Sequence, residues 1–189
     1  MRYCDINQIR LCNILDTLRN SHEMLTRQGR LGLEDARCCN HLIDSDGKDI
    51  GCLVGCLVGP TNFAVGNSMT AMDLDDAKLA LAYKNGTGGC NWSHLSLEDK
   101  ACYQKFLAAL QVLHDSSQGF GFAGTELVLF VLRVLINRVE DIMQRMDHFS
   151  SKEVEYLDFH MTLGNFGGSN FETVYRRITD EINAFIVKK

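Results

Sequence analysis

The chain has 189 residues, a formal net charge of −5 and a pI of about 5.6. This length suits one domain, and we predict a single globular domain over residues 1–189. The acidic balance excludes a general attraction to nucleic acid, so no non-specific nucleic-acid binding is expected. The longest apolar run, residues 127–136, contains Arg133 and is too short to cross a bilayer, so no membrane association is expected.

An even number of cysteines raises the question of a disulfide framework. Three observations favour reduced thiols instead. A chain of this length can fold without disulfides. Its first ten residues contain no apolar secretory segment, and Cys12 and Cys102 lie among aliphatic residues on predicted helical faces, where a thiol packs as a small apolar group. We therefore expect a soluble, cytoplasmic protein with reduced cysteines. The eight residues are Cys4, Cys12, Cys38, Cys39, Cys52, Cys56, Cys90 and Cys102.

The first predicted element is an amphipathic helix over residues 5–28. Its apolar residues recur at helical spacing, Asp5 can cap its start and Gly29 can end it. Residues 44–47 then read Asp-Ser-Asp-Gly, which is typical of a turn. The next segment, residues 50–60, is apolar on all sides and should be buried. Its periodicity does not decide between helix and strand.

Two further helices are predicted before residue 120. The first covers residues 73–85, with Gly86 as its stop and an inner face of Leu74, Ala77 and Leu81. The second opens with Ser96 as N-cap and acidic residues in its first turn, and it ends before Gly119. Its predicted inward side chains are Phe106, Leu107, Leu110 and Leu113.

The most apolar helix is predicted to begin with Thr125 as its cap and to run to about residue 147, in a central position. Residues 157–163 alternate apolar and polar side chains, and helix and strand both stay open there. Residues 171–187 form an amphipathic helical pattern. The sequence thus predicts a mostly α fold, a single compact domain of about six helices. A small β element near 37–50 or 157–163 is left open.

Cysteine and histidine cluster in residues 38–56. Thiolate and imidazole donors are the ligands of tetrahedral zinc, so Cys38, His41, Cys52 and Cys56 are a candidate structural zinc site. The spacing lacks the usual C-x₂-C pairs, and Cys52 and Cys56 stand in an apolar segment that would bury them without a metal. No cofactor is expected on balance, and zinc remains the alternative.

Two strings share the pattern histidine, any residue, hydroxyl, apolar residue. They are His94-Leu95-Ser96-Leu97 and His160-Met161-Thr162-Leu163. The pair is similar to the paired motifs of the 2H phosphoesterase family. That resemblance implies that His94 and His160 act as acid and base on a phosphodiester, while Ser96 and Thr162 hold the phosphate. The alternative interpretation of Ser96 is a helix cap.

Residues 119–124 fit the pattern G-x-G-x-x-G. In a dinucleotide-binding fold these glycines follow a strand and open a helix. Here a predicted helix precedes the string, so an interhelical loop is the favoured interpretation.

No convincing catalytic set emerges from these motifs. The favoured function is therefore a small binding or regulatory protein that acts through protein–protein contacts, and an accessory protein of a phage or bacterium fits this profile. The alternatives are a 2H-like phosphoesterase and a structural zinc-binding domain. A protein partner is expected, and whether the chain is an enzyme stays open, with a non-enzyme favoured.

Overall fold

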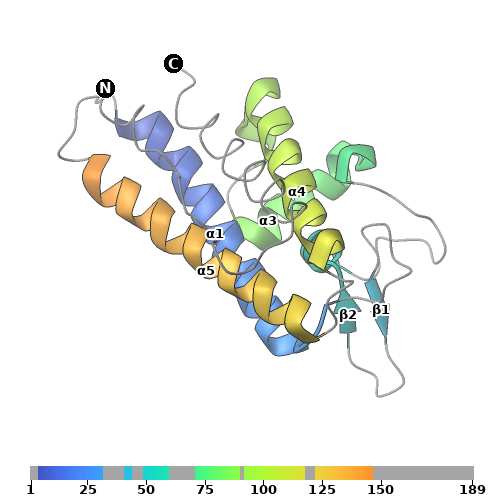
Figure 1. Ribbon diagram of the computed structural model, residues 1–189. Coiled ribbons are helices and arrows are strands. Elements are labelled where there is room, and N and C mark those ends of the chain that lie inside the picture. The colour runs from blue at the N-terminus through green and yellow to red at the C-terminus, as the bar shows by residue number, and fades with distance from the viewer. Residues whose placement is uncertain are drawn as a thin grey trace.

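The computed structural model describes residues 4–31, 41–43, 49–59, 71–89, 92–117 and 122–146 (Figure 1). Within these ranges the chain forms five α-helices, two 3-10 turns and one pair of short strands. The mostly α prediction is confirmed. The predicted elements at 157–163 and 171–187 lie outside the described residues. In chain order the elements are α1 (Cys4–Gln28), β1 (His41–Ile43), β2 (Asp49–Gly51), α2 (Leu53–Val58), η2 (Ala71–Asp73), α3 (Asp76–Thr87), η3 (Trp92–His94), α4 (Leu97–Ser117) and α5 (Phe122–Met146).

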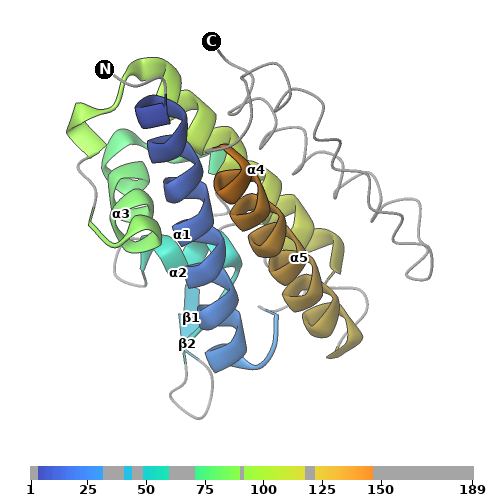
Figure 2. The same ribbon diagram turned by 90° about the vertical axis from the view of Figure 1, so that its left-hand side faces the viewer.

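Helix α1 is the element around which the others are arranged. It packs against α5, α3 and α2, and Figure 2 shows it between α3 and α5. The sequence placed α5 in that central position, because α5 is the most apolar helix. Among the described residues α5 packs mainly against α1 and also against α4, whereas α1 packs against three helices. As predicted, α1 ends before Gly29, whose φ of 76° is a conformation that glycine adopts without strain.

The apolar segment over residues 50–60, whose structure the sequence left open, contains the end of strand β2 and helix α2. Strands β1 and β2 pair antiparallel, with His41 opposite Gly51. Of the two places left open for a small β element, the one near 37–50 contains this hairpin, whose second strand extends to Gly51. The chain then enters α2, which ends at Gly59 with φ 89° and an N–H bond to the Gly55 carbonyl. Of the three glycines in this segment, at positions 51, 55 and 59, only Gly55 lies inside the helix.

Helix α3 begins three residues later than the sequence suggested. Asp75 is its N-cap and accepts a hydrogen bond from the Lys78 N–H. Of the three residues predicted for its inner face, Ala77 is exposed and Leu81 only half-buried, whereas Leu74, just before the helix, is buried. The side chains that face the core are Leu79, Ala82 and Tyr83. Gly86 does not stop the helix, which continues to Thr87 and ends at Gly88 in the left-handed conformation, with φ 73°.

Helices α4 and α5 complete the core. The four side chains predicted to face inward from α4 are all buried, and the helix ends at Ser117 as expected. Helix α5 starts at Phe122, so Thr125 is an interior residue of the helix instead of its cap. The largest fully buried side chains are Tyr83, Phe106, Ile14, Leu18, Leu57, Leu107, Leu110, Leu113, Leu132 and Leu135. No helix among the described residues is long and apolar enough to cross a membrane.

Candidate functional site

The candidate zinc ligands fall on the hairpin and on α2. Cys52 follows β2 directly and is buried, and Cys56 lies one turn further along the chain and is half-buried. The two sulfurs have different polar partners. Cys52 Sγ accepts a hydrogen bond from the Gly55 N–H at 3.1 Å, and Cys56 Sγ donates to Gln28 Oε1 at 3.5 Å. Cys52 thus acts as the N-cap of α2.

The other two proposed ligands are less defined. Pairing of β1 with β2 places the backbone of His41 beside Gly51, the residue before Cys52. Cys38 and the side chain of His41 lie outside the described residues. Among the side chains that the structure does describe, no group of three His, Cys, Asp or Glu residues could hold a metal ion. The zinc site stays a prediction. The described cysteines Cys12, Cys52 and Cys56 form no disulfide.

Gln28, the last residue of α1, ties the hairpin to that helix. Its Oε1 accepts the Gly51 N–H at 3.0 Å, and its Nε2 donates to the Gly51 carbonyl at 3.0 Å and to the Arg30 carbonyl at 2.6 Å. The side-chain amide thus satisfies both polar groups of one buried peptide residue, as a neighbouring strand would. The sequence analysis missed this residue. A glutamine at the end of an amphipathic helix gives no sign of the peptide that it will meet.

His94 and Ser96 stand at the entrance to α4. His94 closes the η3 turn and is exposed. Ser96 Oγ accepts the Asp99 N–H at 3.1 Å and donates to Asp99 Oδ2 at 2.7 Å. These bonds form a helix cap, the alternative interpretation that the sequence offered for Ser96. His160 and Thr162 lie outside the described residues. Convergence of the two strings on one phosphate therefore stays a prediction.

A buried layer of hydroxyl and amide groups joins α1 to α3 and α4. Asn13 Nδ2 donates to the Tyr83 hydroxyl at 2.6 Å, and the Thr17 and Tyr103 hydroxyls lie 3.0 Å apart. Burial raises the pKa of Tyr103, so the phenol stays neutral. Gly86 lies against this layer. A Cβ atom there would lie 2.8 Å from Tyr103 Oη and 2.9 Å from Thr17 Oγ1. The layer needs a glycine at this position, and its polar groups serve the packing of the helices.

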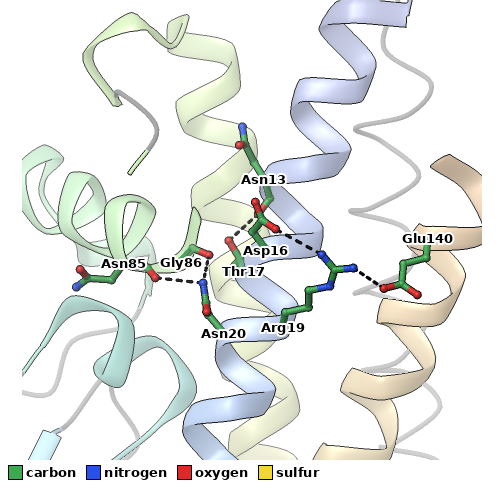
Figure 3. A network of polar contacts seen from close by, with 8 residues as sticks. All are labelled: Asn13, Asp16, Thr17, Arg19, Asn20, Asn85, Gly86 and Glu140. Carbon is green, nitrogen blue, oxygen red and sulfur yellow. Dashed lines mark hydrogen bonds and ion pairs between the residues drawn. The ribbon is translucent and has the colours of Figure 1, made fainter. Parts of the chain in front are cut away.

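The same side of α1 carries further polar contacts, which Figure 3 shows together. Asn20 Nδ2 donates to the Gly86 carbonyl at 2.7 Å, which ties α1 to the last turn of α3. Arg19 reaches in the other direction and pairs with Glu140 of α5 at 2.6 Å. This pair is largely exposed and contributes about 1 kcal/mol or less. These polar groups hold helices together.

The glycine-rich string at 119–124 follows α4 in the chain, and its described residues, 122–124, belong to the first turn of α5. At Gly124, a Cβ atom would lie 1.9 Å from the backbone oxygen of Ser117, so the two helices meet there without room for a side chain. The next residue, Thr125, is buried, and its Oγ1 accepts the Leu31 N–H at 3.1 Å. Because α4 precedes the string, the strand that a dinucleotide site requires is absent from this place. Gly124 therefore serves the close packing of α5 against the end of α4.

Two large apolar side chains remain exposed in the described part of the chain. Leu97, the first residue of α4, is 86% exposed, and Met72 in η2 is 52% exposed. Two glutamines of α4 fix η2 against that helix. Gln104 Nε2 donates to the Met72 carbonyl at 3.1 Å, and Gln111 Oε1 accepts the Ala71 N–H at 2.7 Å. Met72 therefore lies beside the turn of α4 that holds Gln104, which is seven residues, or about 10 Å along the helix axis, from Leu97. We call this region the α4–η2 surface.

Known proteins offer no comparison for these features. No protein family, no curated protein and no solved structure matches the chain.

Proposed function

We propose that this chain is a small binding or regulatory protein that acts through contact with another protein, and that the α4–η2 surface is part of the contact region. The observation that carries the proposal is the exposure of Met72 and Leu97 beside one helix. A single exposed leucine is ordinary on a protein surface. Two large apolar side chains held near each other provide more area that binding could remove from water, and methionine is enriched at protein interfaces.

The fixed position of this surface supports the same proposal. Trp92, just before Leu97, is buried and donates from its indole N–H to Asp76 Oδ1 at 2.9 Å. Lys100 Nζ lies 5.1 Å from the centre of the Trp92 ring. These contacts join the start of α4 to α3, while Gln104 and Gln111 join it to η2. A surface that is ordered before binding loses less conformational entropy when a partner arrives.

Affinity capture from a native lysate tests the proposal, with the intact chain as bait. Leu97→Gln removes the most exposed apolar group without disturbing the core, so we expect it to lose a partner that the parent retains. Glu126→Gln is the matched control, because Glu126 is also exposed near the start of a helix but lies on α5. A parent protein that retains no partner, or a Leu97→Gln variant that retains it as well as the control does, contradicts the proposal.

A further inference from the structure

The α4–η2 surface has an acidic surround. Residues 71–78 and 96–101 carry five carboxylates and two lysines, a net charge of −3. Four of the five carboxylate residues are exposed. The carboxylates belong to Asp73, Asp75, Asp76, Glu98 and Asp99, and the lysines are Lys78 and Lys100.

The two lysines do little to change the charge that an approaching partner meets. Lys78 pairs with Asp75 at 2.5 Å, and its side chain is 21% exposed against 57% for the aspartate. Lys100 pairs with Asp76 at 3.1 Å, with 20% exposure against 71%. In each pair the cation is covered and the carboxylate faces water. Lys105 of α4 is also exposed, so four exposed carboxylates face one exposed lysine and the outward charge around the exposed apolar groups is negative.

Hydrogen bonds keep two of these carboxylates ionised. The side-chain bond from Lys78 lowers the pKa of Asp75, and the indole N–H of Trp92 lowers the pKa of Asp76. Both groups remain charged at neutral pH and in mildly acidic solution. The negative charge is thus a stable property of this surface.

We infer that the partner segment that binds the α4–η2 surface is a basic amphipathic helix. This inference rests on the proposed function and names the chemistry of the partner. Apolar side chains of the partner would contact Met72 and Leu97, which lie beside turns of α4 seven residues apart, a spacing that one face of a partner helix repeats. Lysine or arginine side chains at the edges of its apolar face would meet the exposed carboxylates. Opposite charges at the rim accelerate association and exclude acidic competitors.

The direct test uses two synthetic helical peptides of about five turns each. They share one apolar face, and the polar face carries lysine in one peptide and glutamate in the other. Amide resonances of the intact isotope-labelled chain report where each peptide binds. We expect the lysine peptide to shift the amides of residues 71–76 and 97–101, and the glutamate peptide to leave them unchanged. Affinity for the lysine peptide should fall steeply as NaCl rises from about 0.05 M to about 0.3 M.

Two matched variants separate the charge from the apolar contact. Glu98→Gln should weaken binding of the lysine peptide and flatten its salt dependence, while Glu126→Gln should change neither. Leu97→Gln should weaken binding about fivefold or more. Equal binding of both peptides, shifts confined to other parts of the chain, or no binding at all would each overturn the inference.

Failure here can be told apart from failure of the proposed function. If Leu97→Gln loses a lysate partner while the lysine peptide does not bind, the contact surface stands and the basic helix is wrong. If no lysate partner depends on Leu97, the proposed function itself is wrong.

Discussion

Gly86 shows how a single residue can be required by packing against the preference of its own helix. Alanine is favoured over glycine inside a helix by about 1 kcal/mol. The added methyl group, however, would lie 2.8 Å and 2.9 Å from two buried hydroxyl oxygens that contact each other. We predict that Gly86→Ala lowers the free energy of unfolding by about 1–3 kcal/mol, measured by urea denaturation.

The neighbouring hydroxyl supplies the control for this prediction. Tyr103→Phe removes the nearer of the two oxygen atoms, so Gly86→Ala should cost less in that background than in the parent. A Gly86→Ala variant more stable than the parent would mean that helix propensity outweighs packing here, and the account of the buried layer would be wrong.

His22 makes the stability of the fold sensitive to mild acid. Burial, and then the charge of Arg133, lower the pKa of His22 below its usual value of 6.5. The folded state therefore disfavours the protonated ring. Stability is fully present above about pH 6.5 and declines as the pH falls through that value toward the lower folded pKa.

We predict that His22→Gln makes the midpoint of urea unfolding less dependent on pH between about pH 7 and pH 5. Gln144→Asn, at an exposed position of α5 that does not titrate, is the control and should leave the pH dependence of the parent unchanged. A steeper loss of stability in His22→Gln than in the parent would contradict the prediction.

The role of a single residue could be predicted from the sequence only where its hydrogen-bond partner is a near neighbour in the chain. Ser96 caps α4, which begins one residue later, and Gly29 ends α1, which it follows directly. In both cases residues adjacent in the sequence decide the position. Thr125 has the side chain of a cap but bonds to Leu31, which is 94 residues away. Sequence spacing contains no information about such a partner.

At the scale of elements, apolar periodicity predicted α1 and α4 well and α3 poorly. The prediction for α3 failed at Ala77, which is exposed, and at Leu81, which is only half-buried. In residues 50–59 the pattern could not decide between helix and strand because both occur, with β2 followed directly by α2. The resemblance of the histidine strings and the zinc set stay predictions, since part of each lies outside the described residues.

Gln28 links two of these elements, and its removal should be felt at the hairpin. We predict that Gln28→Leu lowers the free energy of unfolding by about 2 kcal/mol or more, because the N–H and carbonyl of buried Gly51 lose their partner. Hydrogen exchange of the Gly51 amide should accelerate. Gln144→Leu, at an exposed position of α5, is the matched control and should change neither quantity. Unchanged exchange at Gly51 in the Gln28 variant would contradict the role assigned to this amide.

At the scale of the whole molecule, the described helices share one apolar core, and the polar side chains between them are used to join helices. The composition predicted this mostly α core, because ordinary apolar content at helical spacing is sufficient for it. It did not predict the α4–η2 surface. Leu97 reads in the sequence as one more apolar residue at a helix start, and Met72 lies just before the predicted helix over residues 73–85. Only the fold places them beside one helix.

Contact through that surface is the central claim, and site-specific photo-crosslinking tests it most directly. A photoreactive amino acid at position 97 should capture a discrete partner in a native lysate, because the side chain at that position is 86% exposed on the proposed interface. The same amino acid at position 126, exposed on α5, should capture no such adduct. No adduct at position 97, or the same adduct from both positions, would contradict the claim.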